Sequence, residues 1–194
     1  MLTKTKYHLV VEDLKKMIQK NKWKEHFEKA IKSANSKNVP LLGEVKNLDL
    51  FFDWLNAFLY WVPTENSSGR NVNDHLSALY FIADQKTLLA LQNRVIPYNK
   101  ALPLTPFSKW LVDYANALGE FLDTPASLTK ESEQTFYDSP AYNMREYTRP
   151  HGGWNSFNQI FARHFKPGYR PIAAASDQSV IVMPADSTFA GQWE

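Results

Sequence analysis

Apolar residues recur at helical spacing through the first 140 residues of the chain. Between residues 9 and 20 they follow one helical face that ends at Ile18. A second helical set begins at Trp23, and the five-residue step from Ile18 is out of phase with one continuous helix. The pattern therefore predicts two helices that meet near Asn21.

Residues 48 to 62, LDLFFDWLNAFLYWV, form the most apolar stretch of the chain. Asp49, Asp53 and Asn56 make a narrow polar stripe on a helix that is otherwise apolar. This pattern is compatible with a helix that lies in a membrane interface or against a partner. It is also compatible with a central buried helix, and we favour the buried helix.

An amphipathic helix is predicted after residue 104. Thr105 is suited to cap this helix, and Pro106 is suited to its first position. We expect the apolar side of this helix to be core, and this side consists of Phe107, Trp110, Leu111, Tyr114, Leu118 and Phe121. The opposite, polar side consists of Lys109, Asp113, Asn116 and Glu120.

Two further helices flank this one. A surface loop at residues 63 to 71 precedes a helix expected from about residue 73 to 92. On the other side, Thr124 and Pro125 repeat the capping signal for a helix that reaches about residue 137.

Beyond residue 140, prolines and glycines crowd the chain and the helical period is lost. A short helix near residues 155 to 165 and a strand in the β-branched run at 179 to 184 are expected there. The predicted fold class is mainly α. A helical domain over residues 1 to 140 precedes a connecting and short β-containing C-terminal segment over residues 141 to 194.

The composition narrows the class of protein. The 194 residues include no cysteine, which removes disulfides, zinc ribbons and thiol catalysis together. The sequence has no apolar run of about 18 residues and no secretory signal at its N-terminus. The five histidines show no metal-ligand spacing, so we expect no metal site. A cytoplasmic protein is the simplest prediction.

Charge is distributed unevenly along the chain. Residues 1 to 46 carry eleven lysines and five acidic residues, whereas the remaining residues have a net charge of −4. A solvated helix face is the favoured interpretation of this basic region, and a peripheral contact with anionic lipid stays open. The sequence lacks an RNP-like aromatic pair and a glycine-rich phosphate loop, so nucleic acid is not expected as a partner.

The last forty residues contain several features in a fixed order. A helix rich in phenylalanine and ending in arginine is followed by a basic Pro-Gly turn, an Arg-Pro pair and a strand that ends in Pro-Ala-Asp: Phe157, Phe161, Arg163; Lys166, Pro167, Gly168; Arg170, Pro171; Pro184, Ala185, Asp186. This order resembles the phosphatidylserine decarboxylase family of pyruvoyl-dependent lyases. Residues 40 to 194 are similar, more loosely, to a branch with an extra N-terminal helical domain, as in fungal tryptophan decarboxylases.

The resemblance implies carboxy-lyase chemistry on phosphatidylserine or a free amino acid. In that family a pyruvoyl group forms a Schiff base with the substrate amine and accepts its electrons. The group is made from a serine of the protein itself, which an Asp-His pair activates. Asp186 matches the orienting acid and is the catalytic residue expected here. Arg163 and Arg170 are expected to be structural, each clamping a turn or a helix end.

Two departures limit what this chain is expected to do alone. Ser187 stands where the family usually has glycine after Pro-Ala-Asp. The family's catalytic histidine and its Gly-Ser processing site lie downstream of that acid, outside residues 1 to 194. We therefore expect an N-terminal fragment that is inactive by itself and carries no pyruvoyl group.

The expected partner is the missing C-terminal decarboxylase portion or a sister chain. Self-association through the strand at 179 to 184 is also compatible with the sequence, because an unpaired strand edge readily pairs with another copy. The alternative function is a non-catalytic helical module that binds a partner protein, a sister subunit or a membrane surface.

Overall fold

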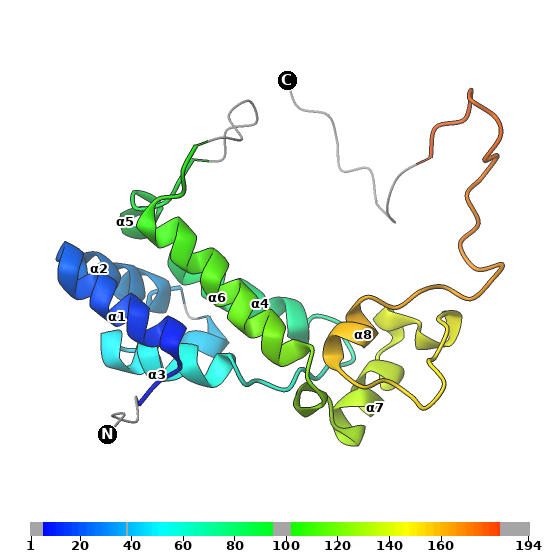
Figure 1. The fold of residues 1–194 in the computed structure, drawn as a ribbon, viewed down its shortest axis with the longest axis horizontal. Helices are drawn as coiled ribbons and strands as arrows, with labels where there is room; N and C mark the ends of the chain where they lie inside the picture. Colours follow the sequence, from blue (N-terminus) through cyan, green and yellow to red (C-terminus); the bar gives the residue numbers. More distant parts are fainter. Residues whose placement is uncertain (1–5, 38, 95–101, 183–194) are drawn as a thin grey trace.

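The structure is a computed structural model that describes residues 6–37, 39–94 and 102–182. These ranges are mainly α-helical, which confirms the predicted class (Figure 1). The helices are α1 (Leu9–Asn21), α2 (Lys24–Asn35), α3 (Leu48–Phe58), α4 (Asn71–Ala83), α5 (Lys86–Leu89), α6 (Pro106–Leu122), α7 (Lys130–Asp138) and α8 (Phe157–Phe161), with 3₁₀ turns η1 (Pro40–Leu42), η2 (Pro125–Ser127), η3 (Pro140–Tyr142) and η4 (Met144–Glu146).

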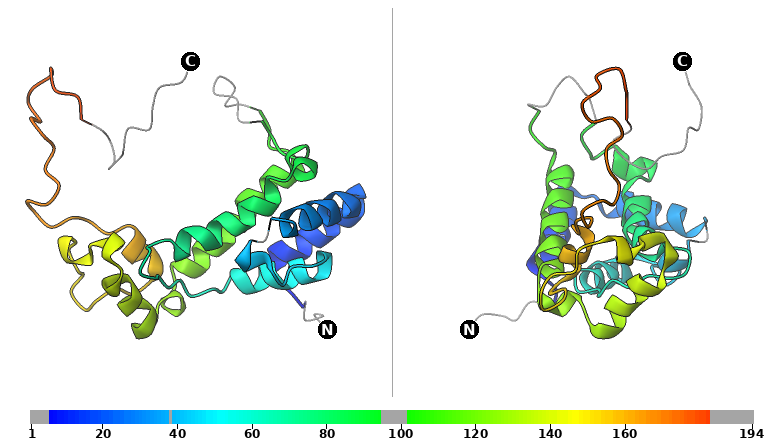
Figure 2. Two further views of the ribbon diagram at one scale, coloured as in Figure 1. Left: turned by 180° about the vertical axis from the view of Figure 1, so that it is seen from behind. Right: turned by 90° about the vertical axis from the view of Figure 1, so that its right-hand side faces the viewer.

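Two hydrophobic clusters divide these helices into two lobes (Figures 1 and 2). The first lobe, α1 to α6, encloses the larger cluster. The second lobe, formed by α7, η3, η4 and α8, encloses the smaller one around Phe136. The long helix α6 runs along the first lobe, and its C-terminal end reaches α8. Trp61 and Leu122 pack against both clusters and so join the lobes.

Two buried hydrogen bonds fix α6 against its neighbours. The indole Nε1 of Trp110 donates to the carbonyl of Val10 in α1 at 2.8 Å. The hydroxyl of Tyr114 donates to the carbonyl of Leu55 in α3 at 2.7 Å. Burial raises the pKa of Tyr114, so the hydroxyl keeps the proton that it donates. Phe107, Trp110, Tyr114 and Leu118 of the predicted apolar stripe are buried in the first core and Leu111 packs against it, as expected, whereas Phe121 is only partly buried and lies outside both clusters.

The predicted junction near Asn21 is confirmed. Lys22 has a left-handed conformation with φ 59°, which ends α1. The amide of Trp23 then donates to the carbonyl of Ile18 at 2.9 Å, closing the helix end before α2 begins. This turn accounts for the change of phase seen in the sequence.

The buried interpretation of residues 48 to 62 is also confirmed. Phe51, Phe52 and Leu55 are each at most 3% exposed in the first core. The helix itself ends at Phe58, and the residues after it leave the helix as a turn. No membrane-spanning helix is found in the part of the chain that the structure describes.

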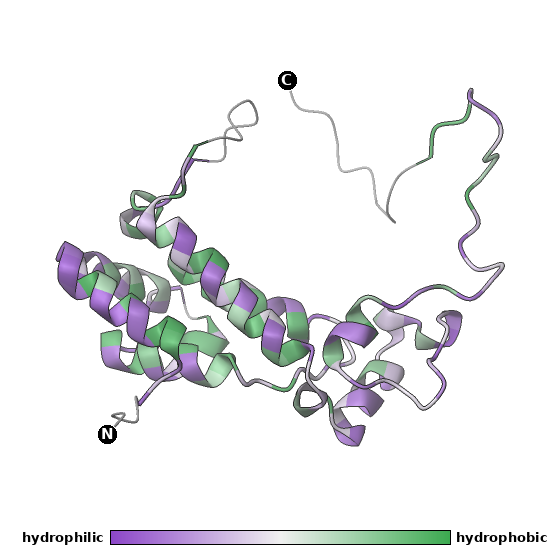
Figure 3. Ribbon diagram, viewed as in Figure 1, coloured by the Kyte–Doolittle hydropathy of each residue, from purple (hydrophilic) through white to green (hydrophobic). Residues whose placement is uncertain are grey.

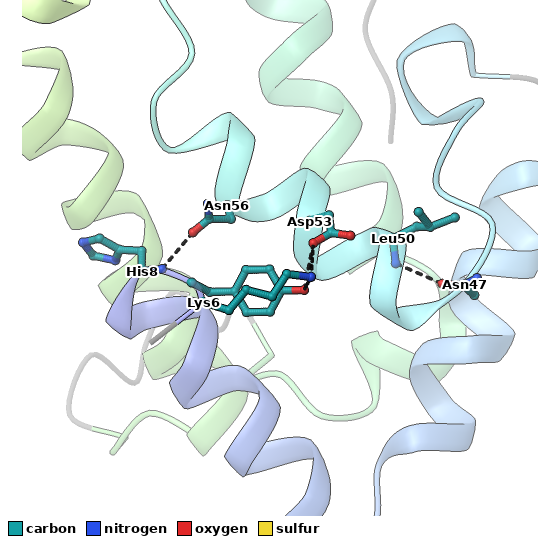
Figure 4. Close-up of polar contacts among 7 residues, drawn as sticks. Lys6, His8, Asn47, Leu50, Asp53 and Asn56 are labelled. Carbon is teal, nitrogen blue, oxygen red and sulfur yellow. Dashed lines mark hydrogen bonds and ion pairs between the residues drawn. The ribbon is translucent and has the colours of Figure 1, made fainter. Parts of the chain in front are cut away.

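The polar stripe of α3 has a partner within the chain (Figure 4). Asp53 accepts hydrogen bonds from Lys6 Nζ at 2.9 Å and from the hydroxyl of Tyr7 at 2.8 Å. Asn56 accepts one from the amide of His8 at 2.8 Å. The hydrogen bond from Lys6, then that from Tyr7, lowers the pKa of Asp53. The stripe therefore holds the segment that leads into α1.

The single helix predicted over residues 73 to 92 is wrong, because it is interrupted after Ala83. Gln85 has an extended backbone, and its side chain accepts a 2.6 Å hydrogen bond from Ser33 of α2. The hydroxyl of Thr87 donates to the carbonyl of His26 at 2.9 Å. These contacts turn α5 onto α2, which a continuous helix would not reach.

The two predicted caps have different outcomes. Thr105 caps α6, with its hydroxyl accepting from the amide of Ser108, as predicted. Thr124 instead precedes the 3₁₀ turn η2, so the expected α-helix does not start there. Thr129 caps α7, and its reciprocal hydrogen bonds with Ser132 form a capping box.

The β-containing segment is not seen in the described residues. An isolated antiparallel bridge joins Tyr147 and Phe165, and residues 179–182 of the predicted strand are not in a strand. A strand needs a neighbour for its backbone groups, and the described part of the chain places none beside residues 179–182. Residues 183 and 184 lie outside the described ranges, and the predicted boundary at residue 140 stays a prediction.

Hydropathy follows these contacts (Figure 3). The helices of the first lobe show polar positions on their outer sides and apolar positions toward one another. By contrast, every residue from 164 to 182 is exposed, including several large apolar ones. The buried core thus ends with α8 within the described ranges, and the chain beyond it keeps the surface contacts of residues 164–170 with residues 145–148.

Candidate functional site

The candidate site is built around residues 154–171, here called the motif segment, which carry most of the features that suggested a family. Its helix α8 is capped by Ser156, whose side chain accepts from the amide of Gln159. The amide of Phe157 donates to Ser127 Oγ at 3.0 Å. Ser127 is fully buried, and its Oγ lies 2.9 Å from the carbonyl of Leu122 at the end of α6. The start of the motif segment is thereby fixed to α6.

Arg163 clamps the end of α8. Its guanidinium donates to the carbonyl of Ile160 at 3.1 Å and to the carbonyl of Tyr142 at 3.3 Å. The same group lies 4.1 Å from the ring centre of Tyr147, a cation–π contact. These contacts confirm the structural interpretation of this arginine, because its two terminal nitrogens donate to backbone carbonyls and its guanidinium faces a ring, although its buried Nε has no hydrogen-bond partner in the described residues.

The residues after Arg163 pair with the chain after η3. The amide of Thr148 donates to the carbonyl of His164, and the amide of Lys166 donates to that of Glu146, each at 2.9 Å. Between them the rings of Tyr147 and Phe165 stack with centres 4.5 Å apart. The motif segment is therefore held by backbone pairing as well as by the arginine.

Arg170 contributes at the far end of this pairing. Its Nε lies 3.4 Å from a carboxylate oxygen of Glu146, and its guanidinium lies 5.7 Å from the ring centre of Phe165. Both contacts hold the turn at Gly168. They confirm the structural interpretation of the second arginine.

A buried glutamate lies in the loop expected at the surface. Glu65 is 7% exposed, so the expectation of a surface loop is wrong at this residue. Its carboxylate accepts from the amides of Asn66 at 2.8 Å and Asn71 at 2.6 Å. Its amide donates to Thr135 of α7 at 2.8 Å. Nothing in the local sequence predicted this burial, because it depends on packing against the second lobe.

Two further observations explain how the loop at residues 64–71 packs against η3. Gly69 has φ +68°, and a Cβ there would lie 2.2 Å from the Cβ of Ala141, so glycine is required. Burial, followed by its hydrogen bond to Glu65, raises the pKa of Tyr142. The loop at 64–71 is thus locked onto η3, the same turn that Arg163 holds from the other side.

A groove of about 800 Å³ lies between the end of α6 and α8, here called the α6–α8 groove. Its walls are largely apolar, and the residues that line it include Asp123, Trp154, Asn158, Phe161, Ala162 and His164. Asn158 Nδ2 donates to a carboxylate oxygen of Asp123 at 2.9 Å and bridges the two helices at the floor. No cluster of histidine and acidic residues able to hold a metal occurs within the described ranges.

The predicted catalytic residue, Asp186, lies outside the described residues, as does Ser187. Of the histidines, His164 lines the groove but is held through its backbone carbonyl. His75 stacks on Trp61, with ring centres 4.0 Å apart. The assignment of Asp186 therefore stays a prediction from the sequence.

Comparison with known proteins gives a short local similarity. A stretch of 45 residues, 23% of this chain, is 47% identical to phosphatidylserine decarboxylase proenzyme 3 of Schizosaccharomyces pombe. It covers 5% of that protein, so the chain spans a small part of the relative that it matches. No protein-family profile matches the chain, and no solved structure shows significant similarity to it. The comparisons support a partial, distant similarity to the phosphatidylserine decarboxylases.

Proposed function

We propose that residues 1 to 194 are the N-terminal portion of a pyruvoyl-dependent decarboxylase that acts on phosphatidylserine or a free amino acid. One observation carries this proposal: the ordered motif from Phe157 to Asp186, together with 47% identity over 45 residues to a phosphatidylserine decarboxylase proenzyme. Single elements of the motif are common, but their combination in one order is specific. The chain alone is proposed to be inactive.

The helical lobes would act as a platform for the motif segment. Arg163 and the backbone pairing with residues 146–148 fix the direction in which the chain leaves α8. Asp186 follows twenty-three residues after Arg163 and would orient a histidine supplied by the rest of the enzyme. The pyruvoyl group would supply the electron sink for decarboxylation, and the serine that forms it is not among residues 1 to 194.

The structure bears on the choice of substrate. An α3 lying in a membrane interface would favour a membrane-bound substrate, but the apolar face of this helix is buried in the first core. The basic region at residues 1–46 remains, and several of its lysines pair with acids on the same helices. A free amino acid is therefore the favoured substrate class.

The test uses the gene. The reading frame after codon 194 is expected to continue and to encode a histidine and a Gly-Ser site. The purified longer protein should appear in intact-mass spectrometry as two chains, one with the mass defect of a pyruvoyl terminus. Asp186→Asn should leave the precursor uncleaved, with Asp177→Asn as the exposed control. An uncleaved wild-type polypeptide would contradict the mechanism.

The α6–α8 groove favours a second candidate, a helical module that works only by binding. This candidate predicts that residues 1 to 194 bind another protein while no cleavage or carbon dioxide release is found in any longer product of the gene. Assays of carbon dioxide release from amino acids and from phosphatidylserine vesicles distinguish the two candidates.

A further inference from the structure

The α6–α8 groove exposes apolar side chains that no described part of the chain covers. Phe161, the last residue of α8, is 68% exposed, although Phe157 and Ile160 on the same short helix are at most 4% exposed. Ala162 beside it is exposed as well. A helix of five residues buries little surface. Because Phe161 stays exposed to water, the chain does not gain the free energy that burial of a phenylalanine side chain provides.

The chain that continues from the groove has the same character. Among residues 164 to 182, all exposed, Ile172 is 69% and Ile181 is 93% exposed. In Figures 1 and 2 this stretch first passes along the second lobe after α8, and its later part runs away from both lobes. Groove and segment are therefore adjacent along the chain, and both expose large apolar side chains. Exposed apolar surface of this kind marks sites of interaction.

A glycine next to the groove has no packing partner among the described residues that would require it. Gly119 lies inside α6, where glycine is unfavourable relative to alanine. A Cβ placed there would meet no atom within 4 Å. The carbonyl of Gly119 accepts from Asn158, which places this glycine at the groove. The contacts of the described residues therefore do not require a glycine at this position.

We propose that the α6–α8 groove, with the apolar side chains of residues 165 to 182, is the surface on which the decarboxylase portion of the longer polypeptide packs. This inference rests on the proposed function. Residues 162–164 form part of the groove, so the polypeptide that follows starts at its rim. In the relative from Schizosaccharomyces pombe the matched stretch is 5% of the protein, so there the similar segment belongs to a far larger polypeptide.

Other occupants fit less well. An anionic membrane needs free basic groups, but Arg163 and Lys166 already donate to backbone carbonyls, and Asp123 adds a negative charge to the groove. A second copy of this chain would have to cover the groove symmetrically. Dimer formation by the 194-residue chain, measured by light scattering, tests that possibility.

The experiment is hydroxyl-radical footprinting of the longer protein and of the 194-residue chain, with modification read by mass spectrometry. The modification rate of Phe161 should fall about sevenfold in the longer protein, as its exposure drops from 68% to about a tenth. Leu9 on α1 is 67% exposed and serves as the matched control, with no expected change. In the longer protein, Phe161→Ser should raise the modification of Ile172, whereas Leu9→Ser should not.

Each remaining outcome decides the proposal. If the modification rate of Phe161 is the same in the longer protein as in the 194-residue chain, this inference is overturned, even where cleavage and the pyruvoyl mass uphold the proposed function. Protection of Phe161 in an uncleaved protein upholds the docking surface and overturns the mechanism. Protection that grows with concentration in the 194-residue chain, with a dimer by light scattering, assigns the groove to a second copy and overturns the occupant. A stop codon after residue 194 overturns both.

Discussion

The first lobe and the segment of residues 162–182 treat large apolar side chains in opposite ways. In the first lobe, Phe27 and Leu55 are completely buried. In the segment, Ile172 and Ile181 are largely exposed. Helical spacing gathers apolar residues on one face that neighbouring helices cover, whereas prolines and glycines prevent that gathering in the segment. The first lobe completes its own core, whereas the apolar side chains of the segment stay uncovered within the described residues.

The largest effect is expected from a cavity in the first lobe. Phe27 packs edge-to-face on Phe107, with ring centres 5.4 Å apart. Phe27→Ala should lower the free energy of unfolding by about 3–5 kcal/mol, because the surrounding helices cannot fill the space. Urea unfolding followed by circular dichroism measures it, with the exposed Tyr80→Ala as control. A loss as small as that of the control would show that the lobe is not tightly packed.

A smaller and more local effect is expected at the boundary between the two regions. Arg163→Met removes hydrogen bonds from a charged donor to two carbonyls, each worth about 1.5–3 kcal/mol at most. The amides of Thr148 and Lys166 should then exchange hydrogen faster, while those of α3 and α6 keep their rates. Arg145→Met, at an exposed side chain, is the control. Equal acceleration in both lobes would mean that the lobes unfold together.

Thr124 was the predicted cap, but Thr129 forms the capping box at the start of α7, so the two threonines should differ in their effect on stability. Thr129→Ala should cost about 1 kcal/mol, because the amide of Ser132 loses its acceptor at the start of α7. Thr124→Ala should cost less, because its hydroxyl makes no cap hydrogen bond. Thermal unfolding of the two variants gives the comparison. The reverse order would contradict the assignment of the cap.

The smallest effect is expected in the exposed segment. Ile181→Ser should change the free energy of unfolding of the 194-residue chain by no more than about 0.5 kcal/mol, because this side chain is 93% exposed. Chemical denaturation measures the effect. A loss comparable to that of Phe27→Ala would show that the segment packs on the lobes and would break the contrast between the regions.

Individual residues show which features of the fold the sequence predicted and which it did not. The helical period located α1, α2, α3 and α6, and Thr105 was recognised as a cap because its hydrogen bond spans only three residues. The break at Gln85 was missed, since it depends on Ser33 fifty-two residues away. The burial of Glu65 was missed for the same reason, because its loop is closed by α7 and η3.

The candidate site divides along the same line. The order of residues from Phe157 to Asp186 suggested the family, and the structural role of Arg163 followed from the chemistry of its guanidinium. The groove beside α8 was not predictable, because it is formed between Asp123, at the end of α6, and residues from 148 to 164, which lie at least twenty-five residues further along the chain. Its floor hydrogen bond between Asn158 and Asp123 exists only after the lobes have packed.

The sequence by itself determined α1, α2, α3 and α6, the cap of α6 and the resemblance to the pyruvoyl-dependent decarboxylases, because these depend on short-range spacing and residue order. Only the tertiary structure decided which polar residues became internal ties, as with Asp53 and Glu65, and which apolar residues were left uncovered. Those outcomes depend on contacts between distant segments. The spacing along one segment does not specify what will lie beside it in space.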